Sequence, residues 1–175
     1  MPKPKPTKIV QTFLEEINSA SHSPRFQIIV TNGVLELLVN TLVEHKCRHG
    51  AKIVTERARE FPYSVKLVLL HEKGFINDAF FNRLEILRKI RNQAAHQAQF
   101  KLTSEMLLPF KGLTDMSKQH DFGEPKNFPF LCGETVMGFW NWGVRLFAPL
   151  FEPHLFKNQK IPEPRIGMYP HFVRE

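Results

Sequence analysis

The segment DAFFNRLEILRKIRNQAAHQAQ, from Asp78 to Gln99, decides the fold because its hydrophobic residues repeat with the period of an α-helix. At about 100° per residue, one broad arc of the helix carries the apolar side chains, namely Phe80, Leu84, Leu87, Ile90 and Ala94. The opposite side carries the polar ones, namely Glu85, Arg88, Lys89, Asn92, His96 and Gln99. The apolar arc has to be buried against other elements, so the segment predicts one helix of a bundle.

Arg91 is the exception, because it falls between Leu84 and Leu87 on the apolar arc. A guanidinium at that place has to reach solvent, pair with an acid or line a polar cleft, since an unpaired buried charge is costly. The position alone leaves two interpretations open, a structural bond to a neighbouring helix and a functional site.

A second helix is predicted directly before this one. Ser64 can cap it, its apolar residues follow, and Gly74 is suited to the left-handed conformation that ends many helices. Asn77 or Asp78 can then cap the helix that carries Arg91. Two helices joined by so short a connection form a helical hairpin.

Two more helices are predicted nearer the N-terminus. Residues 9–17 have apolar side chains at three- and four-residue steps, and Ser23-Pro24 is a typical helix start. The helix after Ser23 should extend to about Lys46 and be central, because its apolar stripe is wide. We expect this stripe to face the core at Phe26, Ile29, Val30, Val34, Leu37, Leu38 and Leu42.

The C-terminal third is aromatic. Thr103 or Ser104 should open a short helix to about Phe110, residues 112–129 read as a loop, and residues 134–150 as a last helix before an irregular tail. The aromatic rings of this third are those of Phe128, Phe130, Phe139, Trp140, Trp142, Phe147, Phe151 and Phe156. We expect them to pack against the bundle or across a dimer interface, an interpretation favoured over the stacking of unpaired bases.

The predicted fold class is therefore all-α, a helical bundle with an additional C-terminal aromatic helix and an irregular tail, because no alternating strand pattern occurs. Residues 1–7 should form a disordered basic arm and residues 8–111 the bundle core. Residues 112–175 should supply the loop, helix and tail that pack on the bundle.

Composition limits the class of protein. There are 24 Lys and Arg against 17 Asp and Glu, a net charge of +7 that suits a polyanionic partner without requiring one. The basic start is not followed by a long apolar stretch, and residues 131–151 contain Glu134, Arg145 and Pro149. We therefore expect no signal peptide, no membrane span and a cytoplasmic location.

No cofactor or metal site is predicted. Cys47 and Cys132 form no paired-cysteine pattern, and His45 and His49 lack an evident third ligand. P-loops, dinucleotide-binding glycine patterns and serine nucleophile elbows are absent.

The segment Arg91-Asn92-Gln93-Ala94-Ala95-His96 resembles the R-N-x-x-x-H motif of the HEPN superfamily of helical-bundle proteins. The run LEILRKIRN, residues 84–92, is similar to the mannitol operon repressor-like branch of that superfamily. The resemblance covers roughly residues 26–107 and fades after them.

This resemblance implies a dimeric bundle whose motif helix faces a cleft, and catalytic members are metal-independent endoribonucleases. It implies that His96 is the acid/base group, that Arg91 holds the phosphate and that Asn92 is a polar orienting residue. An imidazole that titrates near neutral pH and a guanidinium that grips phosphate through paired hydrogen bonds suit these roles.

Helical geometry restricts how the motif can work. Residues five apart point about 140° away from each other, so Arg91 and His96 share no regular helical face. The helix is distorted near Asn92, or Arg91 reaches round, or the site combines two chains. Arg88, Asn92 and His96 do share one ridge, and Arg88 and Lys89 are the predicted nucleic-acid contacts, with Glu85 able to pair with either.

Two functions follow as hypotheses. The first is a HEPN-like, RNA-directed protein that acts as a metal-independent endoribonuclease through Arg91 and His96. The second is a non-catalytic transcription regulator or interaction module of the mannitol operon repressor-like type. The expected partners are a second copy of the chain, RNA or DNA, and an antitoxin or regulatory protein.

Overall fold

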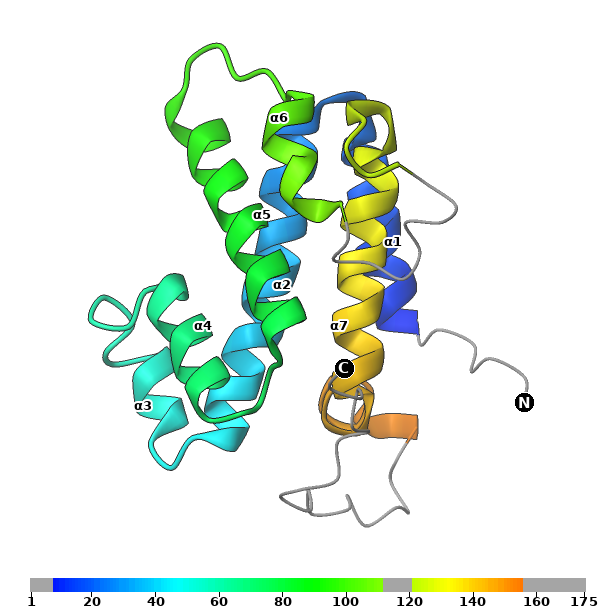
Figure 1. The fold of residues 1–175 in the computed structure, drawn as a ribbon. Coiled ribbons are helices and arrows are strands. Elements are labelled where there is room, and N and C mark those ends of the chain that lie inside the picture. The colour runs from blue at the N-terminus through cyan, green and yellow to red at the C-terminus, as the bar shows by residue number, and fades with distance from the viewer. Residues whose placement is uncertain (1–7, 112–120, 156–175) are drawn as a thin grey trace, which may run out of the picture.

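The protein is an all-α bundle, as predicted (Figure 1). The computed structural model describes residues 8–111 and 121–155, and among these every regular element is a helix and none is a strand. The α-helices are α1 (Lys8–Ser19), α2 (Pro24–Lys46), α3 (Gly50–Val54), α4 (Tyr63–Glu72), α5 (Asp78–His96), α6 (Ser104–Leu107) and α7 (Phe128–Phe151). The predicted basic arm, part of the predicted loop (112–120) and most of the predicted tail (156–175) lie outside the described residues.

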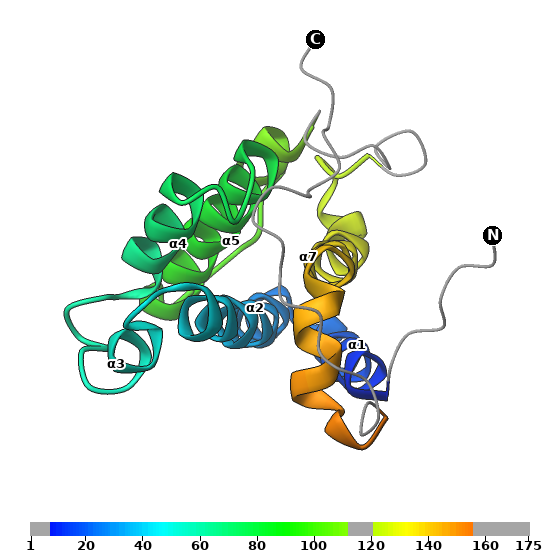
Figure 2. The same ribbon diagram turned by 90° about the horizontal axis from the view of Figure 1, so that it is seen from below.

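Helix α2 is the centre of the bundle, which confirms its predicted place. It contacts α1, α3, α4, α5 and α7. Figure 2 shows α4 and α5 on one side of α2 and α1 and α7 on the other. The C-terminal helix α7 packs directly on α1 and α2, so it is one of the helices that build the core.

A local side-chain cap marks the start of α2, α5 and α6. Three capping side chains accept a hydrogen bond from a backbone N–H of the first turn: Ser23 from Phe26 at 3.5 Å, Asn77 from Phe80 at 2.9 Å and Thr103 from Met106 at 3.5 Å. Each satisfies a donor that the helix itself leaves without a partner. These three predicted starts are therefore confirmed, whereas the predicted cap at Ser64 is wrong, because α4 begins at Tyr63 after Pro62 and has no side-chain cap.

The hairpin of α4 and α5 turns at Gly74, which has a φ of 68°. The Phe75 N–H donates to the Leu70 carbonyl and the Gly74 N–H to the His71 carbonyl, both at 2.8 Å. These two bonds form a Schellman motif, which ends α4 and requires a left-handed residue that glycine supplies without strain. The predicted hairpin is thus confirmed, although α5 ends at His96 rather than near Gln99.

Helix α7 starts earlier than the sequence predicts, at Phe128 instead of Glu134. Pro129, the end of the predicted loop, lies in the first turn of α7. A proline is tolerated there because its missing N–H costs no hydrogen bond. Most aromatic residues of α7 pack into the bundle as predicted, but Phe130 is 57% exposed. The Trp140 ring lies 6.3 Å from Phe13 of α1, and the Phe139 ring lies 5.7 Å from Phe80 of α5.

The predicted core stripe of α2 is wrong in part. Val34, Leu38 and Leu42 are buried, but Phe26, Ile29 and Leu37 are exposed. Helix α2 instead buries polar residues, which find partners across the bundle. The Asn32 side-chain amide donates to the Leu87 carbonyl of α5 at 3.3 Å, and that of Gln27 donates to the Ile17 carbonyl of α1 at 3.4 Å. Such tertiary partners offset the cost of burying an amide.

Among the described residues, α2 is also the one helix long and apolar enough to cross a membrane. Some 56% of its apolar window is buried inside the bundle, as in the central helix of a folded protein. Helix α7, which covers the segment for which we predicted no membrane span, does not meet the same criterion.

The carboxylate of Glu152, just after α7, caps the start of α1. Its Oε1 accepts a hydrogen bond from the Ile9 N–H at 3.0 Å, and the residue is buried. We expect Glu152→Ala to lower the free energy of unfolding by about 1–2 kcal/mol, because α1 loses a cap near the positive end of its dipole. Urea unfolding measures this. Glu152→Gln, which keeps an acceptor oxygen, should recover part of the loss, and exposed Glu15→Gln should change little.

A buried thiol makes stability fall at alkaline pH. Burial between α7 and α2 raises the pKa of Cys132 to about 12, and the neighbouring Thr31 hydroxyl offsets this only in part. In the unfolded state the thiol ionises near its ordinary pKa of 9.0. Between pH 9 and pH 12 the unfolded state therefore binds fewer protons than the folded state, and unfolding becomes easier as the pH rises.

We expect the Cys132 thiol to lower the free energy of unfolding by up to about 1.4 kcal/mol for each pH unit between pH 9 and pH 12. Urea unfolding at pH 8, 9 and 10 of the native chain and of Cys132→Ala tests this, because the variant lacks that part of the slope. Equal slopes for the two proteins would contradict the assignment.

Candidate nucleic-acid interface on α5

The R-N-x-x-x-H residues lie in the C-terminal two turns of α5. The helix is regular from Asp78 to His96, so the expected alternative of a distortion near Asn92 is wrong. Arg91 and His96 therefore leave the backbone about 140° apart, and only the reach of the Arg91 side chain or a second chain can bring them to one substrate.

Arg91 is exposed, so of the alternatives that the sequence leaves open it takes the one in which the guanidinium reaches solvent. The covering helix on that side, α4, begins at Tyr63, whose phenol lies close to Glu85 and Arg88. Helix α5 continues past the start of α4, as Figure 1 shows. The apolar arc is buried on both sides of Arg91 in the sequence, at Leu84, Ile90 and Ala94, whereas Arg91 itself is exposed.

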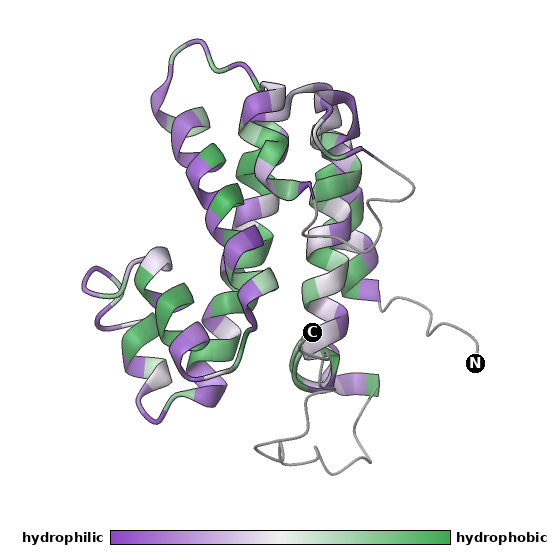
Figure 3. Cartoon of the chain, in the orientation of Figure 1, coloured by the Kyte–Doolittle hydropathy of each residue, from purple (hydrophilic) through white to green (hydrophobic). Residues whose placement is uncertain are grey.

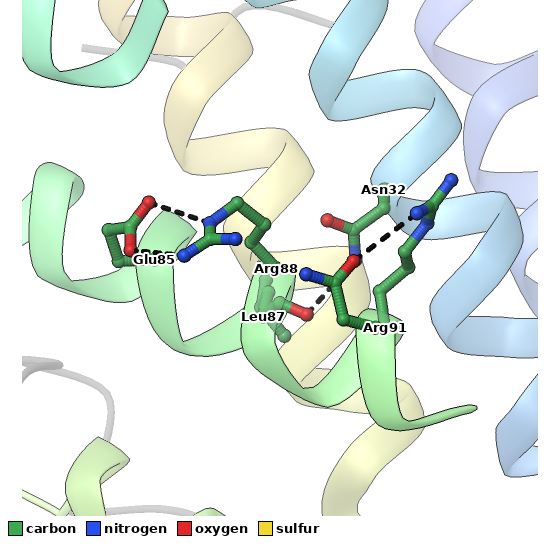
Figure 4. Close-up of polar contacts among 6 residues, drawn as sticks. Asn32, Glu85, Leu87, Arg88 and Arg91 are labelled. Atoms are coloured by element: carbon green, nitrogen blue, oxygen red, sulfur yellow. Dashed lines mark hydrogen bonds and ion pairs between the residues drawn. The ribbon is translucent and has the colours of Figure 1, made fainter. Parts of the chain in front are cut away.

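The Arg91 guanidinium turns toward the polar ridge of α5. Its Nη1 donates to Oδ1 of Asn92 at 3.3 Å, a contact drawn in Figure 4. Asn92 is half-buried and lies one turn before exposed His96, on the ridge that starts at Arg88. Arg91 thus reaches round toward the side of the helix that carries His96.

Arg88 is paired with Glu85, one of the two predicted pairings. Its Nε and Nη2 donate to the two carboxylate oxygens of Glu85 at 2.8 and 2.9 Å, a bidentate ion pair (Figure 4). The hydrogen bond that Arg88 donates to Glu85 raises the pKa of Arg88. An incoming phosphate has to compete with this carboxylate for Arg88, whereas Lys89 is exposed.

Tyr63 lies close to this ion pair and was missed by sequence reasoning. Its hydroxyl is buried and makes no hydrogen bond among the described residues. Burial, and then the nearby charges of Glu36 and Glu85, raise its pKa above the ordinary range. The residue comes from α4 and its neighbours from α2 and α5, so no local pattern could have placed it beside the motif helix.

Arg25 is a second residue that the sequence did not indicate. Its Nη1 donates to the carbonyl of Ala98, just after α5, at 3.2 Å. A cation from the start of α2 is therefore fixed beside the C-terminal end of α5, where the helix dipole is negative. Figure 3 shows this end of α5 mostly hydrophilic, in contrast to α4.

The site is a set of cations and one imidazole on an open surface. Lys89, Arg91 and His96 are exposed, and Arg25 is half-buried at the helix end. No group of three His, Cys, Asp or Glu residues able to hold a metal ion occurs within residues 8–111 and 121–155. The side chains present can contact phosphate and move a proton.

No family model, curated protein or solved structure matches this chain.

Proposed function

We propose that the C-terminal half of α5 binds RNA and that the protein is a metal-independent endoribonuclease of the HEPN type. The observation that carries this proposal is the Arg91–Asn92 hydrogen bond, which turns an exposed guanidinium toward the ridge of His96. An exposed arginine, an amide and an imidazole are the groups that phosphodiester cleavage by a ribose hydroxyl requires.

In the proposed reaction, Arg91 holds the non-bridging phosphate oxygens and Asn92 orients Arg91. His96 accepts the proton of the ribose 2′-OH as that oxygen attacks the phosphorus atom. The bond from phosphorus to the 5′ oxygen breaks, and that oxygen takes a proton from water or from a second imidazole. The products are a 2′,3′-cyclic phosphate and a 5′-hydroxyl.

The test is cleavage of a mixed pool of labelled RNA by the purified full chain in EDTA. We expect cleavage that survives chelation and leaves 2′,3′-cyclic phosphate ends. Cleavage that persists in the Arg91→Ala, His96→Ala double variant would remove this site from the reaction.

The second candidate function is a non-catalytic regulator or interaction module with a nucleic-acid or protein partner. Arg88 favours it, because this motif-ridge cation is already engaged by Glu85, and so does the exposed apolar surface of α2. This function predicts binding without turnover. Either function is consistent with the proposed cytoplasmic location, where RNA, DNA and an antitoxin or regulatory partner would be met.

A further inference from the structure

One side of α2 exposes large apolar residues. The exposed fractions are 60% for Phe26, 40% for Ile29 and 42% for Leu37, and Gly33 between them is also exposed. These four residues, here named the α2 face, recur at steps of three and four and so lie along one side of the helix. In Figure 2 no element of the described chain lies beyond α2 on the side away from α5 and α7.

Helix α4 extends this surface. The Lys66 ammonium donates to the Asn40 side-chain oxygen at 2.9 Å, which holds α4 beside the C-terminal half of α2. On α4, Val65 and Val68 are also exposed. Single exposed apolar residues are ordinary, but a group on two adjoining helices marks an interaction surface.

We propose that this surface binds a second copy of the chain, with the two α2 helices antiparallel and a two-fold axis passing at Gly33. Ile29 lies four residues before Gly33 and Leu37 four residues after it. The axis therefore places Ile29 of each copy on Leu37 of the other, about 6 Å along the helix on either side of the crossing point. The face is complementary to itself in this register.

Gly33 supports the crossing point. A Cβ added there would meet no atom within 4 Å, so nothing inside the chain requires glycine at this position. Glycine is disfavoured in a helix interior, and its φ here is not one that other residues avoid. A contact outside the chain does account for it, because a position without a side chain lets two helices approach closely.

The ends of the two helices also match. Phe26, seven residues before the axis, falls opposite Asn40, seven residues after it, and so meets the second copy's α4 where Lys66 binds Asn40. Exposed Glu44 of one copy falls within about one helical turn of Arg25 of the other. Its negative charge is then also near the positive N-terminal end of the other α2 helix.

The first test is sedimentation of the full chain at increasing concentration. We expect a dimer at micromolar concentration, weakened at least about 100-fold by Ile29→Glu, since the charge would be buried twice in each dimer. Val144→Glu is the matched control, because Val144 is equally apolar and exposed but lies on α7. A native chain that stays monomeric at 100-fold higher concentration overturns the proposal.

The second test distinguishes the proposed register from nonspecific hydrophobic association through the same surface. Gly33→Leu adds apolar area and has open space within the chain, so nonspecific association of two copies would become stronger. The proposed crossing instead predicts a dimer weakened at least about 10-fold while helical content by circular dichroism stays unchanged. A dimer of equal or greater strength contradicts the proposal.

The third test locates the axis and does not depend on how a charged variant folds. In a Cys47→Ser background, Gly33→Cys should form a covalent dimer with copper phenanthroline as oxidant, and Val144→Cys should not. Flotation with phosphatidylcholine and phosphatidylserine vesicles, without dimer formation, would assign the α2 face to a membrane instead. These outcomes hold whether or not the protein cleaves RNA, so the two proposals can fail separately.

Discussion

Replacing His96 by alanine is expected to lower metal-independent RNA cleavage by about 100- to 10,000-fold, the usual contribution of a general acid or base. The imidazole is the group of the motif that can act as a general acid or base. Because His96 is exposed in the last turn of α5, its loss should change the free energy of unfolding by less than about 0.5 kcal/mol. The rate of cleavage in EDTA and a urea unfolding curve measure the two effects.

His45→Ala is the matched control for this variant, because His45 is another exposed histidine in the last turn of a helix, α2. It should cleave at the native rate. A comparable loss in His45→Ala, or a large fall in stability in His96→Ala, would mean that cleavage is lost for a reason other than proton transfer. Arg91→Lys should also lose most activity, because an ammonium keeps the charge but not the paired hydrogen bonds.

The features that the sequence predicted well are those decided within a few residues. Ser23 and Asn77 cap their helices with their own side chains, and Gly74 takes the one backbone conformation that favours it. Glu85 and Arg88, which form an ion pair, are about one helical turn apart. In each case the interacting groups are close in sequence, so the pattern contains the whole interaction.

The features that the sequence predicted poorly depend on which neighbouring helices pack against each face of a helix. The wheel of α5 places Arg91 among apolar residues, but Arg91 is exposed while Ile90 and Ala94 beside it are buried. The stripe of α2 fails for a related reason: this helix is contacted on several sides, and its hydrophobic residues occur all round it. Which of them are buried depends on the neighbours, and Asn32 is buried because Leu87 offers it a carbonyl.

The site residues that sequence reasoning missed also depend on how the helices pack. Arg25 and Tyr63 are far from the motif in sequence and reach α5 through the packing of α2 and α4. A single sequence contains no local signal for such contacts. They are now specific positions at which RNA binding and the stability of the motif helix can be varied separately.

Trp140→Ala is expected to cause the largest loss of stability, about 3–5 kcal/mol, because it removes the ring that joins α1 to α7. Trp140 is 2% exposed, and its ring lies 6.3 Å from Phe13, 5.5 Å from Phe147 and 5.8 Å from Phe151. The cavity would leave these three rings without their common partner, so the loss includes aromatic contacts as well as buried area. Urea or thermal unfolding measures it.

Val144→Ala on the same helix is the control, and it should cost less than about 1 kcal/mol because Val144 is exposed.

The Trp140→Ala variant also tests which helices take part in RNA cleavage. Helix α5 is held mainly by α2 and α4, whereas Trp140 stabilises α1 against α7. RNA cleavage by Trp140→Ala should therefore follow the folded fraction of the protein. A loss of activity at a temperature where the variant is still fully folded would show that α7 acts on the site directly, and the assignment of the chemistry to α5 alone would then be wrong.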